Sequence, residues 1–476
     1  HEIIPYILLE QRETIQKIIM ERNDPDNKDE NEEQPRWLLK WKYKQLSVIP
    51  KIFRLPETQA FIGKWQDSFG LWPQPLEIRG WGGTVESPIS VAEMERLSVN
   101  GILKLFAFYN DKTSGRDWFN PSEHSKGGIG EIAYVFSLCT QKNPQKYLPY
   151  MNTFWESGIS KEYVYALLQG ISDHIRCRFG RLQKPAEVKF IEPLLDGETL
   201  AEVILGWFDK YPQLLENGYK SSEALYAISY VIERNDLQKK LIDYFIKMSV
   251  YPDPQKIEQK IFNQDKKEMN KDDPLRITIN SVRGRVADGV TTLTGRLLEK
   301  EKEVPEELCK LLEHFAKDPV EAVRIHVLKL LPFLEYKKPE KGWVLFSKVF
   351  EKAHPALWPH GYRFLSYQYK EHFDQVSPIL ERIKNEGGKH GAESWGLISA
   401  LCFLDDLITI ESLIVQLKEF NQEDAWSGAV RVFTSNLKTS DTRNKCLNGL
   451  VALIKYAAFP IKLLNTIEHV FEQIPT

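Results

Sequence analysis

Residues 143–175 read NPQKYLPYMNTFWESGISKEYVYALLQGISDHI, and this stretch contains the features that decide the fold. Asn143 followed by Pro144 is typical of a helix N-cap and first helical position. Apolar residues then recur at the three- and four-residue spacing of one helix face. They are Tyr147, Leu148, Met151 and Trp155, and then Val164, Leu167, Leu168, Ile171 and Ile175. One helix therefore ends and the next begins within a few residues, which favours helical hairpins.

The same period extends over most of the chain after Ser98, which is the predicted N-cap of an earlier helix. Further apolar stripes lie at 200–207, 225–232, 237–248, 305–315 and 320–334, and no β-α-β alternation appears. We therefore predict an all-α fold, and more specifically an irregular α-solenoid of helical hairpins of TPR or HEAT type.

Composition and breaks divide the chain into three predicted parts. Residues 1–97 are a Trp-rich helical and irregular linking segment with an acidic loop at 21–35. Residues 98–262 are a first helical-repeat region, and residues 263–476 are a second, HEAT-like one. Because the chain opens with His1 instead of Met, we expect it to be part of a longer polypeptide.

Charge and cysteine usage exclude several classes of protein. The 63 Lys and Arg residues are balanced by 66 Asp and Glu residues, so no sequence-specific nucleic-acid partner is expected. The five cysteines form no C-x-x-C pair, which argues against a zinc module or a disulfide framework. No apolar run reaches the roughly 18 residues of a membrane span. We expect a cytoplasmic protein without a membrane partner.

Catalytic motifs are not found in the sequence. The pairs Gly63-Lys64 and Gly388-Lys389 lack the upstream glycine and following Ser or Thr of a P-loop. The pairs 272–273 and 405–406 are both Asp-Asp, but neither has a third carboxylate at helical spacing, so helix capping or solvated charge is favoured over metal binding. We expect no catalytic, cofactor-binding or metal-binding residue in this chain. An all-helical enzyme with an aromatic-lined cavity is a less favoured alternative, suggested by 12 Trp and 19 Tyr.

Protein-binding anchors are predicted from aromatic side chains in turn-rich stretches, because buried aromatic and arginine side chains dominate most interfaces. The candidates are Trp118 and Phe119 in the loop 110–128, Trp358 and His360, and, as a poorer candidate, Trp81. Loops on one edge of a helical array align, so the first two stretches are expected to contribute to one groove.

Four charged residues are predicted to join helices. Arg283 and Arg285 could hold a phosphate, but an arginine pair on a helical hairpin more commonly bridges adjacent helices. Asp318, followed by Pro319, is expected to cap the helix that carries Arg324, as in the second helix of a HEAT repeat. Arg324 is then expected to bridge to an adjacent turn.

Seven segments, in this order, are similar to the C-terminal sensor region of bacterial antiviral STAND NTPases, the Avs family. They cover the chain from about residue 98 onward and lie at 98–109, 127–133 (GGIGEIA), 143–148 (NPQKYL), 163–170 (YVYALLQG), 279–285 (INSVRGR), 367–382 (YQYKEHFDQVSPILER) and 428–437 (GAVRVFTSNL). Residues 1–97 match this pattern only loosely.

The resemblance implies the function of the chain. In this family an N-terminal effector and a central STAND ATPase precede a helical-repeat sensor, which binds a conserved phage protein, the terminase large subunit or the portal. Binding triggers assembly of a homo-oligomer, expected to be a tetramer, and activates the effector. ATP and Mg are expected only in the NTPase domain, and no cofactor in this chain. The alternative is a generic HEAT- or TPR-type protein-interaction scaffold without a defence role.

Overall fold

The structure is a computed structural model. It describes residues 9–22, 35–47, 49, 51–69, 87–110, 127–180, 182–183, 188–255, 278–456, 459–460 and 462–464. All regular secondary structure in these residues is helical, and they contain no strand. The predicted all-α fold is therefore confirmed. None of the helices described is long and apolar enough to cross a lipid bilayer.

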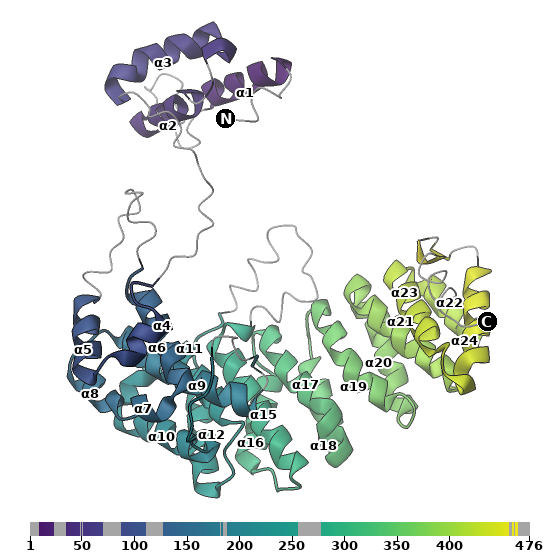
Figure 1. The fold of residues 1–476 in the computed structure, drawn as a ribbon. Helices are drawn as coiled ribbons and strands as arrows, with labels where there is room; N and C mark the ends of the chain where they lie inside the picture. Colours follow the sequence, from purple (N-terminus) through teal and green to yellow (C-terminus); the bar gives the residue numbers. More distant parts are fainter. Residues whose placement is uncertain are drawn as a thin grey trace. The chain divides into compact units, whose positions relative to one another are not determined.

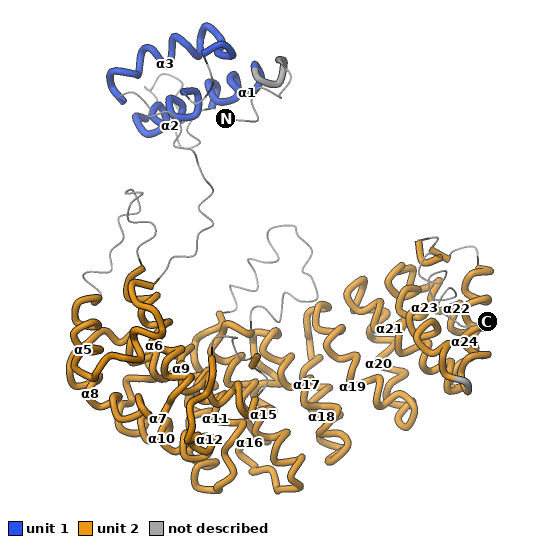
Figure 2. The backbone as a smooth tube through the Cα atoms, in the orientation of Figure 1, with its two compact units in different colours: residues 1–84 blue, residues 85–476 orange. Residues whose placement is uncertain are grey.

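The chain forms two compact units, residues 1–84 and residues 85–476 (Figure 2). Unit 1 has a small apolar core of Tyr43, Leu46, Ile49 and Ile62. The side chain of Gln16 donates to the carbonyl of Phe53 at 2.8 Å and accepts from the backbone N–H of Leu55 at 2.9 Å. The helices of unit 1 are α1 (Leu9–Glu21), α2 (Arg36–Ser47), η2 (Lys51–Phe53) and α3 (Pro56–Phe69).

Unit 2 contains one continuous apolar cluster, which runs from Met94 to Phe459. Its helices follow one another along a curved array (Figure 1). They are α4 (Val91–Arg96), α5 (Val99–Phe108), α6 (Ile129–Lys142), α7 (Pro144–Tyr147), α8 (Tyr150–Glu156), α9 (Lys161–Phe179), α10 (Gly197–Lys210), η4 (Pro212–Glu216), α11 (Gly218–Ile228), α12 (Asn235–Ser249), α15 (Val282–Glu299), α16 (Glu306–Ala316), α17 (Glu321–Lys337), α18 (Pro339–Val349), η5 (Pro355–Leu357), α19 (Trp358–Gln368), α20 (Phe373–Glu386), α21 (Gly388–Leu404), α22 (Ile410–Phe420), α23 (Glu423–Asn436) and α24 (Ser440–Ile454).

Most of these helices belong to two rows. Row A consists of α6, α9, α11, α15, α17, α19, α21 and α23, and each of these helices packs against the next one named. Row B consists of α10, α12, α16, α18, α20, α22 and α24. Within it, α12 packs against α10 and α16, α16 also packs against α18, and α22 packs against α24. Helices that follow each other in the sequence pair across the rows, as α15 with α16 and α17 with α18.

The unit boundaries differ from the predicted domain boundaries. Unit 2 begins near residue 85 and includes α4, whose N-cap Ser90 forms a capping box with Glu93. The predicted boundary between 262 and 263 does not separate two compact units, because α15 packs against both α11 and α12. Most of the predicted acidic loop lies outside the described residues.

Local sequence signals explain where several helices begin. The hydroxyl of Ser98 accepts from the backbone N–H of Gly101 at 3.2 Å, and the side chain of Asn143 accepts from that of Lys146 at 3.3 Å. Both predicted N-caps are therefore confirmed. Helix α17 differs, because its N-cap is Val320 and not Asp318. The carboxylate of Asp318, two residues before the N-cap, accepts from the Val320 N–H at 2.8 Å.

Close approach of row-A helices requires residues without a side chain. A Cβ atom on Gly170 of α9 would overlap the Ser137 carbonyl of α6, and one on Gly428 of α23 would overlap the Glu393 carbonyl of α21. Both glycines lie in segments that carry the family resemblance. At these positions the backbones are in contact, so a larger residue would push the helices apart.

Arg283 joins three segments of unit 2. Its guanidinium donates to both carboxylate oxygens of Asp318, at 2.9 and 3.1 Å, and to the carbonyl of Tyr251 at 2.7 Å. The carboxylate is fully buried, so this bidentate pair is shielded from water. Arg324 donates to the carbonyls of Asp318 and Val349, at 2.8 and 3.0 Å. These are contacts of the kind that the sequence predicted for Arg283, Asp318 and Arg324.

Replacing Arg283 by Ala should destabilise the chain, because the buried carboxylate of Asp318 would lose its cation. We expect the free energy of unfolding, measured by urea denaturation, to fall by about 3–5 kcal/mol. Arg234 is the matched control, because it forms ion pairs with Glu202 and Asp236 at the surface, at 2.8 and 2.7 Å. Arg234→Ala should cost less than about 1 kcal/mol. Equal losses in the two variants would contradict this interpretation.

A buried carboxyl group lies between α17 and α18. Glu335 is 3% exposed, and neither of its oxygens has a hydrogen-bond partner among the described residues. A Cβ atom on Gly342 would overlap this carboxyl group, so the glycine makes room for it. Burial raises the pKa of Glu335 to about 7, against a weaker opposing effect of the Trp343 indole.

The raised pKa of Glu335 predicts a dependence of stability on pH. The folded chain holds this proton up to about pH 7, whereas the unfolded carboxyl loses it near pH 4.5. The contribution of Glu335 to the free energy of unfolding therefore falls as the pH rises through this window, by up to about 3 kcal/mol.

Glu335→Gln should remove this dependence. Urea denaturation should find the variant gaining stability relative to the wild type between pH 4.5 and pH 8, by up to about 3 kcal/mol. Glu340→Gln, at an exposed glutamate on α18, is the control and should show no such gain. A stability difference between Glu335→Gln and the wild type that stays constant with pH would count against a raised pKa.

Candidate functional site

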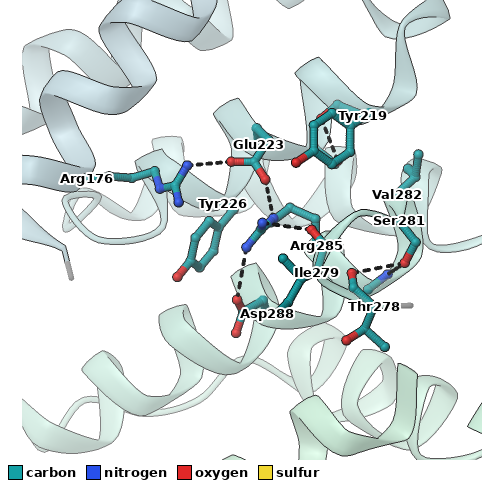
Figure 3. Close-up of polar contacts among 12 residues, drawn as sticks. Arg176, Tyr219, Glu223, Tyr226, Thr278, Ile279, Ser281, Val282, Arg285 and Asp288 are labelled. Atoms are coloured by element: carbon teal, nitrogen blue, oxygen red, sulfur yellow. Dashed lines mark hydrogen bonds and ion pairs between the residues drawn. The ribbon is translucent and has the colours of Figure 1, made fainter. Parts of the chain in front are cut away.

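A chain of charged side chains joins three helices of row A, α9, α11 and α15 (Figure 3). Arg176 of α9 donates to Glu223 of α11 at 2.6 Å, and Arg285 of α15 forms an ion pair with the same carboxylate. Arg285 also lies 3.5 Å from Asp288, whose other oxygen is 3.2 Å from Nδ1 of His326 on α17. We call these five residues the ionic relay. Its charged members link α9, α11 and α15, and the His326 imidazole extends the contact to α17.

Two members of the relay are almost completely buried: Glu223 is 3% exposed and His326 is 1% exposed. Burial lowers the pKa of His326, so the imidazole is neutral, and its Nδ1 lies 3.2 Å from Asp288. Burial raises the pKa of Asp288, but His326, Lys329 and Arg285 lower it by more, so Asp288 is a carboxylate. Burial likewise lowers the pKa of Arg285, and Glu223 and Asp288 raise it by more.

The aromatic ring of Tyr226 lies between two guanidinium groups of the relay (Figure 3). Arg176 is 5.5 Å and Arg285 5.1 Å from the ring centroid, which is within the range of cation–π interaction. The Tyr226 hydroxyl oxygen is 2.5 Å from that of Tyr230. This ring therefore helps to hold two like charges near each other.

Both carboxylates of the relay are engaged by neighbouring side chains. Glu223 accepts from Arg176 and forms an ion pair with Arg285, and Asp288 is engaged by Arg285 and His326. Asp288, held in this way, is a poor general base, because His326, Lys329 and Arg285 stabilise its ionised form. The arrangement is that of an interhelical clamp.

Two hollows open on the exposed side of row A. Hollow 1 lies between α9, α11, α15 and α17 and has a volume of about 650 Å³. It lies beside the relay, because its lining includes Asp288 of the relay and Tyr226, which contacts two relay arginines. Hollow 2 lies between α19, α21 and α23 and has a volume of about 490 Å³. Its lining includes His360, Tyr362 and the ion pair of Glu393 with Arg431, which are 3.0 Å apart.

Exposed tyrosines lie between the two hollows. On α17, Lys329 and Phe333 line hollow 1, and Tyr336, three residues later, lies on the same side of the helix and is 79% exposed. On α19, Tyr367 is 62% exposed and follows His360, which lines hollow 2, by seven residues, or about two helical turns. Since α17 packs against α19, these tyrosines extend from neighbouring helices, and we take the exposed sides of the two helices as one surface. We call this surface, with both hollows, the row-A face.

The predicted anchors have different outcomes. Trp358 is only 2% exposed: its ring is stacked on Phe350 at 4.2 Å, with the Arg382 guanidinium 5.4 Å from its centroid. The expectation that Trp358 is an exposed anchor is therefore wrong, because the ring packs within its own scaffold. His360 lines hollow 2 and stays a predicted binding residue. Trp118, Phe119 and Trp81 lie outside the described residues.

The other predicted residues have structural contacts. Arg285 is part of the relay and also donates to the carbonyl of Ile279 at 2.8 Å. Asp405 accepts from Tyr369 at 2.5 Å and from Lys370 at 2.7 Å, and Asp406 pairs with Lys445 at 2.5 Å. Both carboxylates at 405–406 are therefore paired with lysines, and Asp406 is exposed. The pair 272–273 lies outside the described residues.

Sequence reasoning missed Arg176, Glu223, Asp288 and His326, and also the exposed tyrosines. The sequence does contain a signal for Glu223, because this charged residue lies next to the apolar stretch around Leu225 and Ile228. A charge on a largely buried helix needs a partner, so its position indicates an ion pair. Arg285 and Asp288 are likewise three residues apart on a buried helix. Their partners lie many residues away in the sequence, where no spacing rule applies.

No protein-family model, curated protein or solved structure matches this chain.

Removing the central carboxylate of the relay should destabilise unit 2. In Glu223→Ala, two guanidinium groups would lose their shared partner, so we expect a loss of about 3–5 kcal/mol in the free energy of unfolding, measured by urea denaturation. Glu216→Ala is the control, because Glu216 pairs with Lys161 at 3.0 Å on the surface. A loss in Glu223→Ala no larger than in this control would show that the relay does not hold the helices together.

Proposed function

We propose that this chain is the ligand-sensing helical-repeat region of an anti-phage STAND NTPase. In this proposal its two rows of helices are an α-solenoid of helical hairpins, TPR- or HEAT-like, that operates in the cytoplasm. Its partner is a conserved phage protein, the terminase large subunit or the portal. The chain itself contributes binding, and ATP hydrolysis belongs to an NTPase domain outside it.

The observation that carries the proposal is the row-A face. Eight helices pack in succession, so their exposed sides add up to one long surface with two hollows and with exposed tyrosines between them. Extended surfaces of stacked helices suit the recognition of protein shape, and tyrosine and arginine are the side chains that most often dominate such interfaces. Such a surface fits a protein partner better than a small substrate.

The family resemblance supports the defence role. Of its seven segments, those at 127–133, 163–170, 279–285 and 428–437 fall on α6, α9, α15 and α23, which are all row-A helices. In STAND proteins a bound ligand shifts an inactive monomer toward an active oligomer. Such a shift requires the ligand to bind one state more tightly than the other, and a long surface that spans many helices can supply that difference.

The test is direct binding of purified phage proteins. We expect the chain to bind the terminase large subunit or the portal in isothermal titration calorimetry. The double variant Tyr336→Ala with Tyr367→Ala should lose about 2 kcal/mol of binding free energy, or roughly thirtyfold in affinity.

The matched control lies on row B. The double variant Ile246→Ala with Val415→Ala removes exposed apolar side chains from α12 and α22 and should bind as the wild type does. If neither phage protein binds, the scaffold alternative without a defence role becomes the better account. If binding does not change in the tyrosine variant, the row-A face is not the binding surface.

A further inference from the structure

Hollow 1 has hydrogen-bond donors that nothing in the described part of the chain uses. The ammonium of Lys329 forms no hydrogen bond or ion pair with a described residue, and neither does the hydroxyl of Thr292. The hydroxyl oxygens of Tyr226 and Tyr230 are 2.5 Å apart, so one O–H donates to the other and the second O–H is left over. Lys329, Thr292 and this tyrosine pair all line the hollow.

The other polar groups that line hollow 1 are mostly engaged. Asp288 is held by Arg285 and His326, and Arg296 donates to the carbonyls of Ser229 and Ile232, at 2.9 and 3.4 Å. Glu299 also lines the hollow and is exposed. It follows Thr292 by seven residues, or about two helical turns, and lies beyond Arg296, so its carboxylate is not among the groups near Thr292. Near Thr292, the donors that make no hydrogen bond or ion pair with a described residue are therefore one ammonium, whose charge also lowers the pKa of Asp288, and two hydroxyls.

The row-A face has a second unpaired cation beyond hollow 1. Arg363 of α19 is exposed, and its guanidinium makes no hydrogen bond or ion pair with a described residue. It lies four residues before the exposed Tyr367, on the same side of the helix. By contrast, Arg431 pairs with Glu393, and Lys370 pairs with Asp405. Two isolated cations separated by exposed tyrosines suit carboxylates on a protein better than the closely spaced phosphates of a nucleic acid.

We propose that the row-A face binds an acidic segment of a protein partner, with one Asp or Glu carboxylate in hollow 1. Lys329 and Thr292 donate to this carboxylate together with the spare hydroxyl proton of the Tyr226–Tyr230 pair. A second carboxylate of the same segment pairs with Arg363, and Tyr336 and Tyr367 cover its apolar parts. This inference rests on the proposed function, since it names the chemistry of the surface that the partner presents.

The experiment uses the full chain and a defined probe. Fluorescence anisotropy measures the affinity for a short labelled peptide of glutamate and tyrosine, and for a matched peptide with glutamine in place of every glutamate. We expect the glutamate peptide to bind at least about tenfold more tightly at low salt. Lys329→Ala should weaken its binding about tenfold, and Arg363→Ala should weaken it by several-fold.

Two further variants make the test specific. Tyr226→Phe combined with Tyr230→Phe removes both hydroxyls and should weaken the glutamate peptide by several-fold while unfolding near the wild-type temperature. Lys418→Ala removes an exposed cation from α22 in row B and should leave affinity unchanged. If the double tyrosine variant does not fold, Lys329→Ala alone decides, because Lys329 is exposed and holds no helix in place.

Several outcomes would overturn the inference. Equal affinity for the glutamate and glutamine peptides, or equal weakening by Lys329→Ala and Lys418→Ala, would show that hollow 1 does not select a carboxylate. Tighter, Lys329-dependent binding of a single-stranded DNA of the same charge would replace the protein partner with a nucleic acid. Binding of a phage protein without binding of the glutamate peptide would refute this inference alone. Binding of the peptide with neither phage protein bound would refute only the proposed function.

Discussion

Each interior helix of row A must be buried on two opposite sides, against the helix before it and the helix after it. Unit 2 contains no strand in its described residues, so these helix-to-helix contacts and the pairing with row B account for its core. The constraint explains why Gly170 and Gly428 lie where neighbouring backbones touch. It also explains why charges on the sides of row-A helices need partners, since an unpaired buried charge would cost several kcal/mol.

The ionic relay satisfies this constraint and at the same time shapes the surface. Arg176, Glu223, Arg285 and Asp288 neutralise one another between the helices, so the helices can pack closely without being apolar on every side. The same pairing uses up most of the charge near hollow 1 and leaves the Lys329 ammonium without a hydrogen bond or ion pair to a described residue. Stability and recognition therefore depend on the same few helices. A ligand in hollow 1 would contact α11, α15 and α17 directly beside the clamp that joins them.

Sequence reasoning was most successful where the signal is local. The N-caps Ser98 and Asn143 and the stripe on α17 depend on residues three or four positions apart, and all three are present in the structure. The relay depends on pairs such as Arg176 and Glu223, which are 47 residues apart, so no periodicity could reveal them. The sequence also does not show which aromatic residues are buried. Trp358 is buried and Tyr367 is exposed, although both lie on α19.

The central claim is that the row-A face is where the partner binds. Hydrogen–deuterium exchange of the chain with and without a bound phage protein tests it most directly, because backbone amides report which helices are covered or stabilised. The account predicts slower exchange on α15, α17, α19 and α21, with row B unchanged. Slower exchange confined to row B, or no change with either the terminase large subunit or the portal, would contradict it.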